Sequence, residues 1–203
     1  DGLVALWHFD ELELQGESSS LIKDYSDWDS SAENLSCGAG CPTIVSDGKF
    51  GRAYSFGASK NLYVNDSSEL GDSEEYTISG WINMTGAGVT ANTGSGGIQI
   101  YPIFTKGMAE TEANNEDIWA FVGIDATNHL CADYEEITTS TNVPICGATA
   151  ISLNEWNHIT VVRNSTNLVV YLNGVEDGIR AAPNAPTTIS VVKVGVGVAY
   201  TNT

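Results

Sequence analysis

Short runs of β-forming residues recur along the whole chain, and amphipathic helical periodicity is almost absent. The runs are spaced by roughly 8–15 residues and are separated by clusters of Gly, Asn, Asp and Ser, which is the pattern of an all-β chain. About a dozen such runs predict a two-sheet antiparallel sandwich. We expect strands over residues 3–9, 52–56, 62–64, 76–83, 101–105, 118–124, 129–134, 144–150, 156–163, 168–173, 176–180 and 188–198.

The clearest turn lies in NLVVYLNGVEDG, where Asn173 and Gly174 separate two apolar runs. Both residues tolerate positive φ, so they predict a type I′ hairpin turn, whose twist matches that of the flanking strands. The sequence TGAGVTANTGSGG, residues 85–97, is too polar and glycine-rich to pack, and it predicts a surface loop. Such a loop is either a binding loop or a tolerated insertion.

The 203 residues fit one domain, and no repeat or shift in composition divides them, so we expect a single domain over residues 1–203. The 26 acidic and 8 basic residues give a formal charge of -18. This charge disfavours nucleic acid and anionic lipid as partners, and the apolar runs are too short for membrane insertion. The acidic excess suits divalent cations, or it is a solvated surface that aids solubility.

The four cysteines predict two disulfides. Cys131 and Cys146 are equally distant from the centre of EEITTSTN, so in a hairpin they would lie opposite one another. A bridge that closes about 16 residues contributes on the order of 3 kcal/mol in the chain-entropy model. Cys37 and Cys41 in CGAGC then close a small loop that glycine permits. The alternative is a zinc site, but zinc ligand pairs usually stand roughly two to four residues apart, unlike Cys131 and Cys146.

Four Asn-X-Ser/Thr sequences are candidate glycosylation sites, at Asn34, Asn65, Asn83 and Asn164. Chance alone would produce one or two of them in a chain this rich in Asn, Ser and Thr. Together with paired cysteines they favour a secreted glycoprotein, located outside the cell or on its surface. A chain that begins DGLVALWHF fits a processed, mature form.

Several segments, taken in order, resemble the laminin-G-like, concanavalin A-like jelly-roll superfamily. GLVALWHFDE is similar to its opening strand, and DGKFGRAYSFGASKNLYVNDSSEL to a Gly-Lys-Phe-Gly turn with the two strands after it. YTISGWIN resembles a core strand with a buried Trp81, and YPIFTKG and NEWNHITVVRNSTNLVVYLNGV continue the order. The resemblance covers residues 2–195 and implies a two-sheet antiparallel jelly-roll sandwich.

The end of the chain departs from this resemblance. In VVKVGVGVAYTNT, one face of a predicted strand carries Val192, Val194, Val196, Val198 and Tyr200. Members of the superfamily usually add a strand of the pattern Gly-x-Ile-Asp-Glu-Val-x-Ile-Tyr beside the opening strand, and the sequence lacks it. Either the opening strand or this terminal strand then has no neighbour, and unpaired edges recruit other chains.

The missing strand motivates the first functional hypothesis. It is a secreted, non-catalytic structural subunit that assembles with other copies of itself into a filament or surface layer by β-strand complementation. Within this hypothesis, the terminal apolar strand is the assembly strand. The alternative is a lectin-like carbohydrate-binding or adhesion module, with glycans as partners, which the resemblance to the superfamily favours.

Catalysis is not expected. Jelly-roll glucanases carry a Glu-x-Asp-x-x-Glu pattern on one strand, because glycoside hydrolysis needs two carboxylates that flank the scissile bond. Glu116 and Asp117 are adjacent and point to opposite faces, while Asp133 and Glu135 lack a third acid. The sequence also contains no nucleophile elbow, phosphate-binding glycine loop or local histidine pair.

Candidate ligands for calcium gather in the polar loop KDYSDWDSSAEN, which contains Asp24, Asp27 and Asp29. Hard cations take several carboxylate and carbonyl oxygens from flexible loops. The resemblance adds that a loop after the opening strand often helps to bind a structural calcium. The alternative is a solvated acidic loop without a cation.

Sugar-binding sites need exposed aromatic side chains near polar groups. Trp28, in the same acidic loop, is a weak candidate and is the tryptophan that we expect to be exposed. Trp81, Trp119 and Trp156 are expected in the core, because a tryptophan in a strand pattern usually packs.

Overall fold

The computed structural model describes residues 2–10, 13–26, 33–37, 40–58, 60–65, 70, 73–109, 118–186, 193–197 and 200–201. Strands dominate these ranges, and their only helical element is a single turn, η1 (Glu13–Gln15). None of their helices has the length and hydropathy that crossing a membrane requires. The all-β prediction is confirmed.

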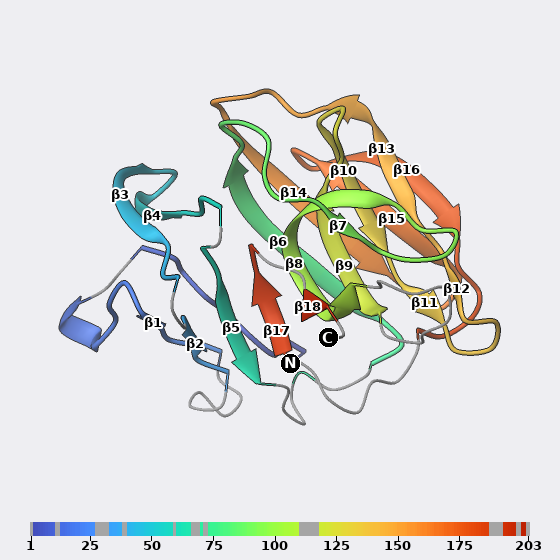
Figure 1. The fold of residues 1–203 in the computed structure, drawn as a ribbon, viewed down its shortest axis with the longest axis horizontal. Helices are drawn as coiled ribbons and strands as arrows, with labels where there is room; N and C mark the ends of the chain where they lie inside the picture. Colours follow the sequence, from blue (N-terminus) through green and yellow to red (C-terminus); the bar gives the residue numbers. More distant parts are fainter. Residues whose placement is uncertain are drawn as a thin grey trace.

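The first sheet contains most of the strands (Figure 1). Its order is β1 (Leu21–Ile22), β2 (Leu35–Ser36), β5 (Leu62–Asn65), β17 (Lys193–Val196), β8 (Gln99–Ala109), β9 (Ile118–Ile124), β10 (His129–Asp133) and β13 (Ile145–Ala150). Neighbours along this order are antiparallel. Two short strands also pair with β8, namely β7 (Ala91–Asn92) and β18 (Tyr200–Thr201), of which β18 runs parallel to it.

The second sheet is antiparallel and stacks face to face with the first (Figure 1). Its order is β16 (Val175–Ala181), β15 (Asn167–Leu172), β14 (Trp156–Arg163) and β6 (Tyr76–Asn83). The β15–β16 turn has φ angles of 52° at Asn173 and 81° at Gly174, so the predicted positive-φ turn is confirmed. Two hairpins stand apart from both sheets, β3 (Thr43–Gly48) with β4 (Gly51–Ser55), and β11 (Glu135–Glu136) with β12 (Thr141–Asn142).

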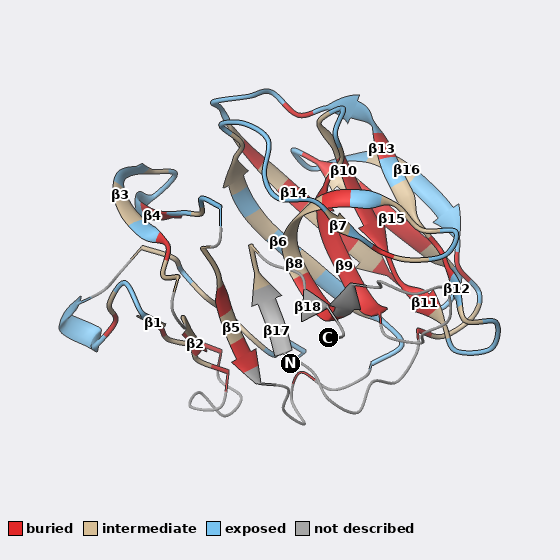
Figure 2. Ribbon diagram, in the orientation of Figure 1, coloured by how far each residue is buried: buried red, intermediate tan, exposed pale blue. Residues whose placement is uncertain are grey.

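Side chains from both sheets meet in the main core. Val122 and Leu130 of the first sheet belong to one buried cluster with Ile159 and Val170 of the second. Buried and half-buried residues alternate along β14, as they must in a strand with one face on a core. A second buried cluster surrounds Leu62 at the other end of the first sheet, and Figure 2 shows both buried regions in red.

Most predicted strands are present, and β6, β9 and β14 have the predicted bounds. The strand predicted over residues 3–9 is wrong, because this segment joins no sheet. Leu6 N donates to Asp24 Oδ1 at 2.7 Å and Leu6 O accepts from Tyr25 N at 2.9 Å, so a loop takes the place of a neighbouring strand. The segment still packs against the second cluster through Ala5, Trp7 and Phe9.

The terminal strand lies inside the first sheet. Val194 and Val196 of β17 pair with β5 on one side and with β8 on the other. The prediction that this strand leaves its backbone uncovered as an assembly strand is therefore wrong, because the ladder satisfies both of its edges. Val192 and Val198 lie outside the described residues, and Tyr200 begins β18.

The glycine-rich segment over residues 85–97 is partly packed, contrary to the prediction. β7 pairs with β8, and Thr93 is completely buried. Ala91 and Ile98 pack against Ile100 and Phe121 on the outer face of the first sheet. The segment can be buried because its polar groups find partners within the chain, as in the 2.7 Å bond from Ile98 N to Thr93 Oγ1.

Both predicted disulfides are present. Cys131 and Cys146 face each other directly in the β10–β13 ladder, with a Cα–Cα distance of 4.1 Å. Cys37 and Cys41 are joined across a separation of four residues. The zinc alternative therefore does not apply to these cysteines.

Candidate functional site

The outer face of the second sheet carries an exposed tryptophan. Trp81 keeps 40% of its surface exposed, so the prediction that it is buried is wrong. Residues alternate along β6, and Trp81 shares its outward face with Thr77 and Ser79. These two polar residues in YTISGWIN were the sequence signal that this face of the strand meets water. Trp119 is 6% exposed, as predicted.

Other aromatic side chains surround Trp81. The ring centroids of Trp81 and His158 are 5.1 Å apart, and those of Trp81 and Phe50 are 5.9 Å apart at an interplanar angle of 84°. Lys49 Nζ lies 4.3 Å from the centroid of the Trp81 ring. Phe50 is 73% exposed, which is unusual for a side chain of this size.

Hydroxyl groups border the aromatic rings. Ser79 Oγ lies 3.1 Å from His158 Nε2 and 2.9 Å from Thr160 Oγ1. The ladder explains this proximity, since His158 is opposite Trp81 and Thr160 is opposite Ser79 in the β14–β6 register. We call this surface the aromatic platform, and define it by Lys49, Phe50, Ser79, Trp81, His158 and Thr160.

Two of these residues come from the turn between β3 and β4. Gly51 has a φ of 107°, a conformation that side chains rarely adopt, and a Cβ built at Gly48 would overlap the backbone oxygen of Arg52. The sequence Gly-Lys-Phe-Gly therefore folds into a tight turn. It places Lys49 and Phe50 against Trp81, a contact that the sequence pattern of the turn does not predict.

The aromatic platform offers the kinds of group that binding surfaces use. Flat aromatic rings offer apolar area, and the adjacent hydroxyl and imidazole groups offer hydrogen bonds that orient a ligand. Nucleophilic catalysis needs a base that a third group orients. Within the described residues, no carboxylate forms a hydrogen bond or an ion pair with His158.

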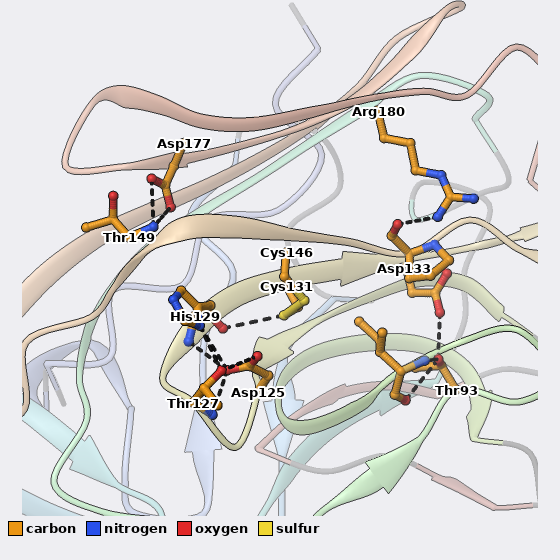
Figure 3. Close-up of a disulfide and its surroundings, with 12 residues drawn as sticks. Thr93, Asp125, Thr127, His129, Cys131, Asp133, Cys146, Thr149, Asp177 and Arg180 are labelled. Atoms are coloured by element: carbon orange, nitrogen blue, oxygen red, sulfur yellow. Dashed lines mark hydrogen bonds and ion pairs between the residues drawn. A yellow bond between two sulfur atoms is a disulfide. The ribbon is translucent and has the colours of Figure 1, made fainter.

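A buried polar cluster lies on the outer face of the first sheet (Figure 3). Asp133 Oδ2 accepts from Thr93 Oγ1 at 2.5 Å and from Asn142 Nδ2 at 3.2 Å. All three residues are at most 2% exposed, and burial raises the pKa of Asp133 to about 7. These contacts fasten the loop after β7 to β10 and β12. The cluster is therefore part of the packing of this face.

The family comparison agrees with this architecture. Residues 56–202 match the family described as the concanavalin A-like lectin/glucanases superfamily. The chain belongs to this superfamily. The resemblance inferred from the sequence is thus confirmed, and so is the jelly-roll fold class.

Solved structures with a similar fold include three domains. The binding domain of Paraclostridial Mosquitocidal Protein 1 has a TM-score of 0.65 at 17% identity, with 89% of this chain and 42% of that chain covered. Domain 4 of AbnA, an extracellular arabinanase of Geobacillus stearothermophilus, was solved in complex with arabinotriose. It has a TM-score of 0.54 at 17% identity, with 81% of this chain and 70% of that chain covered. The receptor binding domain of botulinum neurotoxin D has a TM-score of 0.57 at 11% identity, with 90% of this chain and 43% of that chain covered.

Identities this low show the fold alone. The chain spans less than half of the mosquitocidal and botulinum chains. A comparison with curated protein sequences gives no match.

The predicted calcium loop is described only in part. Asp27, Trp28 and Asp29 lie outside the described residues. Asp24 is buried, and its carboxylate accepts from Leu6 N at 2.7 Å, Ser26 N at 3.0 Å and Ser26 Oγ at 2.6 Å. These hydrogen bonds hold Asp24 within its loop, and calcium binding by Asp24, Asp27 and Asp29 stays a prediction.

One other group of metal-type ligands lies close together in the described part of the chain. It contains Asp125, Cys131 and Cys146. Because both sulfur atoms belong to the disulfide, this group is not a metal site. The Asp125 carboxylate instead stabilises the turn that follows it, where it accepts hydrogen bonds from Thr127 N and His129 N (Figure 3).

Three of the four candidate glycosylation sites have described side chains. Asn34 Oδ1 accepts from Asp24 N at 2.9 Å. Asn164 Oδ1 accepts from Thr166 N and Asn167 N in the β14–β15 turn. Asn83 ends β6, and for Asn65 only the backbone, in β5, is described.

Proposed function

We propose that the chain is a non-catalytic extracellular module that binds carbohydrate on the aromatic platform. The observation that carries this proposal is the exposure of Trp81 on β6, between His158 of β14 and Phe50 of the β3–β4 turn. A pyranose ring can stack its C–H groups on an aromatic face while its hydroxyl groups form hydrogen bonds with neighbouring polar groups.

The neighbours in fold and the two disulfides support this proposal. One of them was solved with arabinotriose, and two others are named as binding or receptor binding domains. The two disulfides favour an extracellular location, since such bonds persist in oxidising environments. Mass spectrometry of native material would test both this location and the occupancy of the four sequons.

The test of the proposed function is a glycan array followed by titration calorimetry on the best ligand. Trp81→Ala should lower the affinity at least tenfold, because an anchoring aromatic residue typically contributes more than about 1.4 kcal/mol. Val175→Ala is the matched control, since Val175 is 69% exposed and lies outside the platform. Unchanged affinity in Trp81→Ala, with the fold intact by circular dichroism, would overturn the proposal.

Calcium dependence stays a prediction that rests on Asp24, Asp27 and Asp29. If the acidic loop binds calcium, the ion stabilises the folded state and raises the melting temperature. Thermal unfolding with calcium and with a chelator measures this difference. Equal melting temperatures with calcium and with the chelator would contradict the predicted calcium binding.

We also propose self-association, in the form of a filament or layer built by β-strand complementation, but through a different strand. β6 has eight residues, no charge and no proline, and it pairs with β14 in unbroken register. Its other edge has no strand partner within the described residues. Charged residues and proline protect an edge strand from pairing with other chains, and a long regular edge that lacks them recruits further strands.

Sedimentation velocity over a range of concentrations tests this second proposal. Thr77→Lys adds a charge at the β6 edge and should shift assemblies toward the monomer. Ile179→Lys adds the same charge on β16, where the residue is 55% exposed, and should leave assembly unchanged. A wild-type protein that stays monomeric at all concentrations would exclude self-association.

A further inference from the structure

Lys49 is an exposed cation in a strongly acidic chain. The sequence contains 8 basic and 26 acidic residues. Lys49 nevertheless lies against the ring of Trp81, and it has no ion-pair partner within the described residues. Asp47 is on the same hairpin and does not pair with it.

Other basic residues are engaged elsewhere. Lys106 and Arg163 are buried and donate to backbone carbonyl groups, namely those of Leu70 and Glu74. Arg52 pairs with Glu13 at 4.0 Å, and Arg180 donates to Pro144 O. Lys49 differs from these residues because its ammonium is held on a candidate binding surface without an anion.

We propose that the aromatic platform selects negatively charged sugars, whose carboxylate or sulfate group pairs with Lys49. This inference rests on the proposed carbohydrate-binding function. The Lys49 ammonium lies over the ring face on which a sugar would stack. A neutral sugar that stacks there displaces the cation and gives it no partner. An acidic sugar displaces it too, but provides an anion at the rim of the ring.

The net charge of -18 does not cancel this local effect. At physiological ionic strength the screening length is about 8 Å, so distant carboxylates contribute little to the potential at the platform. A cation beside the ligand acts within that length. The tight Gly48–Gly51 turn, in which Gly51 has a φ of 107°, fixes the backbone of Lys49. The Lys49 side chain therefore starts next to Trp81, and an ammonium displaced from the ring face can still reach a ligand on that ring.

Two matched pairs of ligands test the inference by titration calorimetry at 0.15 M salt, about physiological strength. One pair is sialyllactose and lactose, and the other is a uronic acid oligomer and its carboxyl-reduced neutral form. The wild type should bind the acidic member of at least one pair roughly tenfold more tightly. Lys49→Gln should bring its affinity down to that of the neutral member, and Lys49→Arg should retain the preference.

The possible outcomes separate this inference from the proposed function. Equal affinity of the wild type for acidic and neutral members, or a preference that survives in Lys49→Gln, would overturn charge selection. If Trp81→Ala still abolishes binding in that case, the carbohydrate-binding function stands. If no sugar binds to the wild type, or if binding ignores Trp81, both fail.

Discussion

At the scale of single residues, buried polar side chains form specific hydrogen bonds that link distant segments of the chain. Arg163 is 2% exposed, and it donates to the carbonyl oxygens of Glu74 and Asn184 while its guanidinium lies 5.0 Å from the ring of Tyr134. It links the loop before β6 to the segment after β16. The planar guanidinium of arginine can donate hydrogen bonds to carbonyl groups in two directions, whereas the ammonium of lysine is a single compact donor group.

Arg163→Leu should lower the free energy of unfolding by roughly 2–4 kcal/mol, since buried carbonyl oxygens lose their donors. Arg163→Lys should lie between this variant and the wild type. Arg52→Leu is the control, because its contact with Glu13 is exposed and such pairs contribute about 0–1 kcal/mol. Urea denaturation measures all three, and equal effects of the Arg163 and Arg52 changes would contradict the assignment.

Asp133 should make stability depend on pH. Burial raises its pKa from 3.8 to about 7, so between these values the folded chain holds a proton that the unfolded chain releases. Its contribution to stability is therefore present in full below about pH 4 and is lost as the pH rises through about 7. Asp133→Asn should gain stability relative to the wild type between pH 5 and pH 8, measured by urea denaturation across that range. A constant difference between the two proteins would show that the carboxyl group does not titrate in this way.

At the scale of elements, alternation in the sequence predicts strands well and their neighbours poorly. β6 and β14 have the bounds that their apolar and polar alternation predicted, because one face of each strand meets the core. The pairing of β17 with β5 and β8 joins residues far apart in sequence, which no local pattern encodes. The same limit explains Trp81 and Phe50, whose proximity depends on how a hairpin packs against a strand.

The position of β17 leads to a prediction at this scale. Deletion of residues 193–203 should abolish cooperative folding, since β17 joins the β1–β2–β5 part of the first sheet to β8. Near-ultraviolet circular dichroism and the breadth of the urea transition measure this loss. A truncated protein with a sharp transition would show that the two parts hold together without β17.

At the scale of the whole molecule, the two outer faces of the sandwich differ. The outer face of the first sheet is covered in part by β7 and the loop after it. The outer face of the second sheet exposes Trp81 to solvent, with the exposed Phe50 of the β3–β4 turn beside it. One side of the sandwich is also linked between the sheets, where Asp177 of β16 accepts from Thr149 N of β13 (Figure 3). The proposed carbohydrate-binding surface therefore lies on the outer face of the second sheet.

Nuclear magnetic resonance titration of the isotope-labelled protein with its best glycan tests this claim most directly. We expect amide shifts to change first at residues 49–50, along β6 and along β14, and Trp81→Ala should abolish these changes. Changes confined to residues 85–98 and to the first sheet, with β6 and β14 unaffected, would contradict it.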